Sequence, residues 1–134
     1  MTKGILVIDD DLRLLKITSK MLDRFLNQSS HEFQIMTALS AQAGEKIIND
    51  GISQNFICHV IVCDYKMPEM TGLEFHRKLR RDERWKTMPF ILYTSEPFEN
   101  LETSDYSYDY VPKVPGDYTV LFYTIKKILD KVPK

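Results

Sequence analysis

The sequence predicts an α/β fold in which helices cover both faces of a doubly wound, five-stranded parallel sheet. Short apolar, β-branched runs alternate with segments of helical period five times along the 134 residues. The runs are continuous rather than alternating, as expected of parallel strands that are covered on both faces. Five such units are too few for an eight-stranded barrel, so right-handed crossovers favour an open sheet.

The first two units lie in the N-terminal part of the chain. Ile5–Asp9 predicts a strand, and Asp11 is placed to cap the helix that follows. This helix has a wide apolar stripe, made of Leu14, Leu15, Ile17, Met21, Leu22, Phe25 and Leu26. Phe33–Ala38 predicts the second strand, and Ser40 caps a second helix to about Asp50, where a glycine can end it.

The third unit and the strand after it follow the same plan. His59–Asp64 predicts the third strand. Thr71 and Glu74 have the spacing of a capping box, which opens a helix that runs to about Arg81. Phe90–Ser95 is a short apolar run and predicts the fourth strand.

The fifth unit ends the chain. Tyr108–Pro112 predicts a strand, and its proline suits only the edge of a sheet. Asp117 is expected to cap the last helix. The apolar face of that helix consists of Leu121, Phe122, Ile125, Ile128 and Leu129, with lysines opposite.

Composition indicates a cytoplasmic protein that binds neither nucleic acid nor membrane. The net charge is −1, and no apolar run is long enough to span a bilayer or to form a signal peptide. The basic stretch Arg77–Lys86 is interrupted by acids and is interpreted as a solvated helix end. Cys58 and Cys63 are expected on opposite faces of one strand, unable to pair, as suits reduced thiols.

Polar residues gather where the predicted strands end. In such sheets ligands bind outside the carboxyl ends of the strands. Those ends carry Asp9, Asp10 and Asp11, then Asp64, Thr94, Ser95 and Lys113. Clustered carboxylates repel one another and need a cation, and a set of oxygen ligands without histidine or cysteine suits Mg²⁺.

These residues resemble those of a response-regulator receiver domain of two-component signalling. The resemblance rests on "VIDDD", on "DYKMPEMTG" with Asp64 and Gly72 eight apart, on Thr94 closing a strand, and on "YVPK" with Lys113. It covers essentially the whole chain and implies a single-domain receiver over residues 1–134 with no output domain. It also implies the flavodoxin-like strand order 2-1-3-4-5.

The resemblance implies a phosphoacceptor and a metal site. Asp64 matches the residue that takes a phosphoryl group from a histidine kinase or phosphotransfer protein, and a carboxylate can act as such a nucleophile. Asp9 and Asp10, with Asp64 and the backbone carbonyl of Lys66, match the Mg²⁺ ligands. Lys113 matches the lysine that contacts the phosphate. We expect no enzyme turnover beyond self-catalysed phosphotransfer and autodephosphorylation.

Further roles follow from the same resemblance. Thr94 matches a hydroxyl that acts with Lys113 on the phosphoryl group and, with the aromatic Tyr110, forms the conformational switch. Lys66 and Glu96 match the two positions that tune phosphate lifetime. Their opposite charges predict an ion pair over the mouth of the site, where it would hinder the water that attacks the acyl phosphate.

The sequence also departs from the family. Val114 follows Lys113 where the family usually has proline. Because cis peptide bonds are nearly confined to X–Pro, this substitution argues against the cis bond that the family has after the lysine. Thr94 and Lys113 are 113 − 94 = 19 positions apart, about one helical turn less than in the family. We therefore predict a stunted or irregular fourth helix. Acids and aromatics but no Lys or Arg lie from Thr87 to Pro112, which predicts a surface for a basic partner or for self-association.

Two other interpretations use the same fold. A degenerate receiver would act only as a phosphorylation-independent interaction module, although every catalytic position holds the expected residue type. A flavodoxin-like small-molecule binder would need a Ser/Thr/Gly-rich phosphate loop after the first strand. The acids at that position would repel a flavin phosphate instead.

Overall fold

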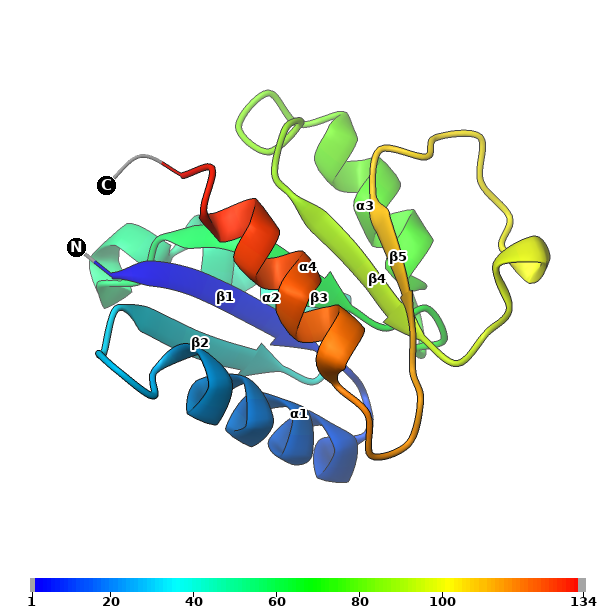
Figure 1. Cartoon of the computed structure of the whole chain (residues 1–134). Helices are drawn as coiled ribbons and strands as arrows, with labels where there is room; N and C mark the ends of the chain where they lie inside the picture. The colour runs from blue at the N-terminus through cyan, green and yellow to red at the C-terminus, as the bar shows by residue number, and fades with distance from the viewer. Residues whose placement is uncertain (1, 133–134) are drawn as a thin grey trace.

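The strands form one parallel sheet. The computed structural model describes residues 2–132, so residues 1, 133 and 134 of the predicted domain lie outside the described part. The strand order is β2-β1-β3-β4-β5, which confirms the predicted fold class and order (Figure 1). The strands are β1 (Lys3–Ile8), β2 (Phe33–Ala38), β3 (Cys58–Cys63), β4 (Phe90–Thr94) and β5 (Asp109–Pro112).

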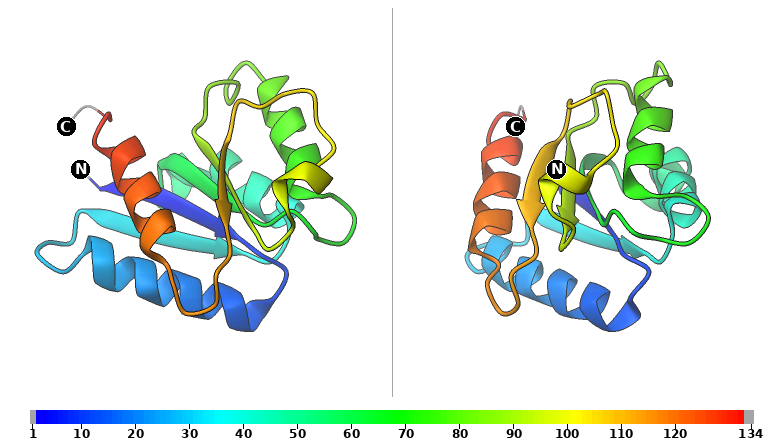
Figure 2. Two further views of the ribbon diagram at one scale, coloured as in Figure 1. Left: turned by 45° about the vertical axis from the view of Figure 1, so that its right-hand side comes forward. Right: turned by 90° about the vertical axis from the view of Figure 1, so that its right-hand side faces the viewer.

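Helices cover both faces of this sheet. The helices are α1 (Leu12–Leu26), α2 (Ala41–Asn49), α3 (Gly72–Arg80) and α4 (Thr119–Leu129). Figures 1 and 2 show α1 and α4 on one face and α2 and α3 on the other. Across residues 2–132, no helix has the length and apolar character that crossing a membrane would need.

Each face of the sheet carries its own apolar core, because successive side chains of a strand point to opposite sides. On β1, Leu6 and Ile8 pack toward α2 and α3, whereas Ile5 and Val7 pack toward α1 and α4. Full burial of one such aliphatic side chain contributes about 1.5–3 kcal/mol. The two cores together hold the carboxyl ends of the central strands in fixed relative positions.

The central strands end one residue earlier than the sequence predicted. β1 ends at Ile8, β3 at Cys63 and β4 at Thr94. Asp9 and Asp64 are therefore the first loop residues, although their backbone N–H groups still donate to the neighbouring strand, at 3.1 and 3.0 Å. Since neither residue belongs to a strand, their side chains need not point to alternate faces of the sheet, and both lie at the same edge.

The cap of the last helix differs from the prediction. The N-cap of α4 is Tyr118, and Asp117 lies one residue before it. Asp117 closes a tight turn by donating its N–H to the carbonyl of Val114 at 2.9 Å. Gly116 has φ +77° in this turn, a value that favours glycine. The Asp117 carboxylate still accepts the Thr119 N–H at 3.0 Å, so its capping chemistry is kept.

The two cysteines are free but do not face opposite sides, as the strict alternation of one strand had predicted. Both contact the core beside α2 and α3. The register between β1 and β3 shifts at Gly4 and Ile5, which pair with Cys58 and Val60 and leave His59 as an extra residue. The His59 ring accepts the Gly4 N–H at 2.9 Å, which satisfies the donor that the shift would leave unpaired.

The connection from β4 to β5 lacks a regular α-helix, as the sequence predicted. Its only helical part is the 3-10 turn Phe98–Asn100, and an irregular segment follows (Figure 1). Two α3 residues anchor this segment. The Ser107 carbonyl accepts from Arg80 at 2.7 Å and lies 3.0 Å from Nε2 of the buried His76.

His76 makes this anchor sensitive to acid. Burial is the main cause that lowers the pKa of His76 below its usual 6.5. The unfolded chain therefore takes up the proton first, and the stability that the neutral ring contributes is lost as pH falls through about 6.5. We expect unfolding by urea to become easier between about pH 7.5 and about pH 5.5.

A His76→Phe variant isolates this effect, because phenylalanine keeps an aromatic ring against Phe90 and Tyr108 but cannot be protonated. Arg80 would still hold the Ser107 carbonyl. The charged neighbours Arg77, Arg80 and Asp105 are the same in both proteins. The variant should show a flatter dependence of stability on pH, and a slope as steep as that of the wild type would exclude His76 as the source.

Candidate functional site

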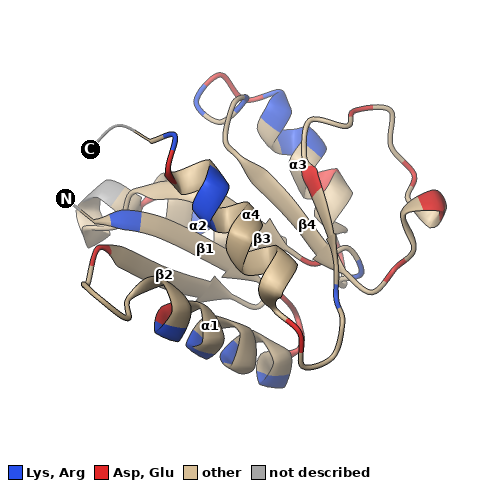
Figure 3. Cartoon of the chain, in the orientation of Figure 1, with Lys and Arg blue, Asp and Glu red and all other residues tan. Residues whose placement is uncertain are grey.

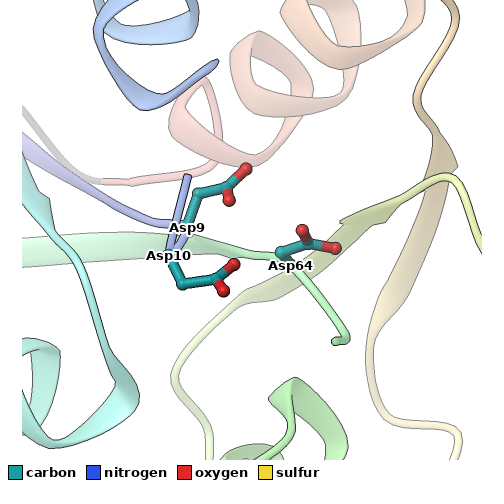
Figure 4. Close-up of side chains that lie close together, drawn as sticks. All are labelled: Asp9, Asp10 and Asp64. Atoms are coloured by element: carbon teal, nitrogen blue, oxygen red, sulfur yellow. The ribbon is translucent and has the colours of Figure 1, made fainter. Parts of the chain in front are cut away.

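Three carboxylates meet at the carboxyl ends of β1 and β3. Asp9, Asp10 and Asp64 each offer an oxygen, and these atoms lie within 4.8 Å of one another (Figure 4). Asp9 is buried, Asp64 is half-buried and Asp10 is exposed. The cluster therefore opens to solvent on one side, and the sequence had identified all three residues.

Local contacts fix the direction of Asp64. Its Oδ1 accepts the Tyr65 N–H at 2.7 Å, which leaves Oδ2 directed into the site. The Gly72 N–H donates to the Tyr65 carbonyl at 2.9 Å and draws the start of α3 against this loop. A Cβ atom on Gly72 would lie 2.1 Å from the Asp64 carbonyl oxygen, so a side chain there would displace the loop. Close backbone approach explains the Asp64–Gly72 spacing.

The three successive acids after β1 have different structural positions. Asp9 Oδ1 accepts the Asp11 N–H at 2.9 Å, which holds the buried carboxylate against the start of α1. Asp11 caps α1, as predicted, by accepting the N–H groups of Arg13 and Leu14 at 3.0 and 3.1 Å. Asp10 has neither role and points toward Asp64 (Figure 4).

Lys113 joins the acids from β5. Its ammonium donates to Asp9 Oδ2 at 2.7 Å and to Asp64 Oδ2 at 3.0 Å. Burial alone would lower the pKa of Lys113, but the hydrogen bond to Asp9 and the charges of Asp64 and Asp9 outweigh it and raise that pKa. Burial also raises the pKa of Asp9. The lysine therefore stays charged and offsets part of the repulsion within the cluster.

The donor set fits Mg²⁺. All three ligands are carboxylate oxygens, which this hard cation prefers, and Asp10 leaves the set open to water. Lys66, whose backbone carbonyl was the fourth predicted ligand, lines a 330 Å³ cavity with Asp10. Lys113 donates to Oδ2 of Asp9 and of Asp64, and no hydrogen bond or ion pair joins it to Asp10 among residues 2–132.

Glu96 links the predicted switch residues to the rim. Its N–H donates to Thr94 Oγ1 at 3.2 Å, and its carbonyl accepts the Tyr110 hydroxyl at 2.7 Å. Its carboxylate forms an ion pair with Lys66 at 3.0 Å, which confirms the predicted pairing. Hydrogen bonding to Lys66 is the main cause that lowers the pKa of Glu96. Glu96 thus contacts Lys66, Thr94 and Tyr110.

A cleft of 590 Å³ adjoins the cluster on the side of α1 and α4. Its walls include Leu14, Ile17, Val114 and Tyr118, which the sequence had not indicated as site residues. Tyr93 also lines it, and burial raises the pKa of Tyr93 to about 12. A tyrosine in a buried strand looks like a core residue, so no sequence signal placed it at the site.

The Lys113–Val114 peptide bond is trans, since residues 2–132 contain no cis peptide. The Lys113 N–H donates to the Thr94 carbonyl at 2.8 Å and continues the β4–β5 ladder by one residue. The backbone of Lys113 is therefore fixed by the sheet and by the turn that follows.

Known proteins resemble this chain in sequence and in fold. Residues 5–110 match the family described as the response regulator receiver domain. The chemotaxis protein CheY1 of Helicobacter pylori is 32% identical over 92 residues, which are 69% of this chain and 67% of that protein. A receiver domain protein from Clostridium thermocellum has a TM-score of 0.74 at 25% identity, covering 98% of this chain and 96% of that one.

A response regulator of known ligand state has the same fold. TrrA from Thermotoga maritima, solved in complex with Mg²⁺ and BeF, has a TM-score of 0.74 at 24% identity. The similarity covers 95% of this chain and 99% of that one. The family match spans most of the sheet and both acid-bearing loops. The chain belongs to the response regulator receiver domain family of two-component systems.

Proposed function

We propose that this receiver domain takes a phosphoryl group from a histidine kinase or phosphotransfer protein onto Asp64 and thereby switches its interactions with a downstream protein. The observation that supports this best is the position of Lys113, whose ammonium bridges Asp9 and Asp64 at the open rim of the sheet. A carboxylate held beside a fixed cation can act as a nucleophile toward a phosphorylated donor.

The proposed transfer begins at Asp64, whose Oδ2 faces the Lys113 ammonium. An Asp64 oxygen attacks the phosphorus of the donor phosphohistidine, the new O–P bond forms, and the N–P bond breaks with its electron pair returning to the imidazole. Negative charge spreads over three phosphoryl oxygens during this step. Lys113 and the Thr94 hydroxyl are proposed to meet two of them. Mg²⁺, held by Asp9, Asp10, Asp64 and the Lys66 carbonyl, would neutralise further charge when bound.

The switch is proposed to act through Glu96. Thr94 Oγ1 now accepts the Glu96 N–H, so a Thr94 hydroxyl drawn toward a phosphoryl group would release that contact. The Glu96 carbonyl, which holds the Tyr110 hydroxyl, would then move as well. The ring centroids of Tyr110 and Phe98 are 5.4 Å apart. This contact connects the site to the β4–β5 segment, residues 95–108.

This segment is the proposed surface for the downstream partner. Figure 3 shows acidic residues along it and no Lys or Arg, in agreement with the sequence from Thr87 to Pro112. Phe98 and Tyr106 are 47% and 61% exposed, with ring centroids 6.1 Å apart. Exposed aromatic faces beside carboxylates attract Lys and Arg side chains. We therefore propose a basic protein segment as the partner.

Beryllofluoride with Mg²⁺ tests both parts of this function through hydrogen exchange. If Asp64 binds the phosphoryl mimic, amides of residues 64–72 should become more protected. If the β4–β5 segment is the output surface, exchange in residues 95–110 should change in the same sample. Protection in 64–72 alone would leave a phosphoacceptor whose output lies elsewhere. No change in either region would favour the alternative of a degenerate, phosphorylation-independent interaction module.

The Lys66–Glu96 ion pair should lengthen the life of the phosphorylated state. Lys66 is largely exposed, so the pair contributes little to stability. We propose that it acts instead by hindering the water that would attack an Asp64 acyl phosphate. Lys66→Ala and Glu96→Ala should each speed dephosphorylation without a change in melting temperature. The double variant should be no faster than the faster single variant, and additive effects would show that the two residues act independently.

A further inference from the structure

Tyr93 lies beneath the lysine of the site. It directly precedes Thr94 in β4 and is only 6% exposed. The Lys113 ammonium stands over its ring, with Nζ 5.5 Å from the ring centroid. We propose that Tyr93 is a positioning residue that holds the Lys113 ammonium against Asp64 through a cation–π contact. The role in phosphotransfer rests on the proposed function, but the contact itself does not.

Three groups surround the Lys113 ammonium: the Asp9 carboxylate, the Asp64 carboxylate and the Tyr93 ring. The negative face of a tyrosine ring attracts a cation, and the attraction is larger where water is excluded. Phosphorylation would convert the Asp64 carboxylate to an acyl phosphate, and a bound cation would compete for Asp9. The ring is the partner that these events leave chemically unchanged.

The side chain of Lys113 needs such a restraint. Its backbone is fixed, because its N–H bonds to Thr94 and the turn from Val114 to Asp117 follows at once. Its flexible stem, however, borders the 590 Å³ cleft, which offers the ammonium room to turn toward solvent. Tyr93 lines the same cleft and occupies the space beneath the ammonium.

The ring rather than the hydroxyl should matter. Among the hydrogen bonds of residues 2–132, none joins the Tyr93 hydroxyl to Lys113. Tyr93→Phe keeps an aromatic face, whereas Tyr93→Leu keeps an apolar side chain and removes that face. The pair of variants therefore separates the cation–π contact from simple packing in the core.

The first measurement needs neither metal nor phosphodonor. In NMR spectra of the full chain, the ε-methylene protons of Lys113 should be shifted upfield by the Tyr93 ring. The shift should persist in Tyr93→Phe and disappear in Tyr93→Leu. If Tyr93→Leu retains it, the ring does not hold the lysine. Tyr93→Met replaces the leucine variant if urea unfolding shows that the latter is not folded.

The second measurement is the rate of phosphorylation by phosphoramidate with Mg²⁺. Tyr93→Leu should react about fivefold more slowly than the wild type, and Tyr93→Phe within about twofold of it. Equal loss in both variants would assign the effect to the hydroxyl and contradict the cation–π role. If the wild type does not react at all, the proposed phosphoacceptor function fails, while the Lys113 proton shift still decides the role of Tyr93.

Discussion

Replacing Asp64 with asparagine should abolish phosphoryl labelling of the protein. The wild type, given Mg²⁺ and a phosphohistidine donor, is expected to acquire label that is stable to acid and labile to base, as an acyl phosphate is. Asparagine has nearly the same shape as aspartate but lacks the anionic oxygen that attacks phosphorus. The Asp64 oxygen that faces Lys113 is Oδ2. Because asparagine offers no anionic oxygen at this position, the loss of labelling should be complete rather than partial.

A matched control excludes a general effect of charge. Asp130→Asn removes one negative charge from an exposed residue at the far end of α4 and should label like the wild type. Circular dichroism should show that both variants are folded. Labelling of Asp64→Asn at the wild-type level would mean that another residue accepts the phosphate. Absence of labelling in the wild type with every donor tested would favour the degenerate receiver.

Replacing Asp10 with alanine should weaken Mg²⁺ binding strongly, and replacing Asp11 should not. Asp10 contributes an oxygen to the three-carboxylate cluster, whereas Asp11 uses its carboxylate to cap α1. Even residues behind the direct ligands change metal affinity by about 10- to 100-fold, so the loss of a ligand should cost at least that much. Isothermal titration with Mg²⁺ measures the difference.

The two variants control for each other. Each removes one negative charge at neighbouring positions, so their long-range effects on a cation are similar. Asp11→Ala should instead lower the free energy of unfolding by about 1 kcal/mol through the lost cap. The Asp11 N–H that donates to Asp9 belongs to the backbone and is kept. Equal losses of Mg²⁺ affinity would contradict the assignment of these two roles.

Much of the fold followed from periodicity. Continuous apolar runs predicted the buried parallel strands, and Asp11, Ser40 and Thr71 predicted where three helices begin. These signals are local, since a cap depends on a side chain within three residues of the amide that it accepts from. The prediction for Asp117 was wrong because this residue closes a turn with Val114, so the helix begins one residue later and Tyr118 is its N-cap.

Other features required the packed sheet. His59 is an extra residue in β3 because the register between β1 and β3 shifts, so that Gly4 pairs with Cys58 and Ile5 with Val60. This shift puts Cys58 on the same side of the sheet as Cys63. The lack of a regular helix between β4 and β5 could be predicted from the short length and the composition of this connection. Its anchoring to α3 through Ser107 could not, because His76 and Ser107 are 31 positions apart.

The sequence by itself determined which chemical groups stand at the strand ends. In a parallel sheet all carboxyl ends lie on one edge, so the acids, Thr94 and Lys113 had to meet there. The tertiary structure alone decided their contacts. Lys113 is 104 positions from Asp9 and 49 from Asp64, and only the packing of β5 beside β4 brings its ammonium to both. The same packing places Tyr93 beneath that ammonium, because contact across strands depends on register rather than on any local pattern.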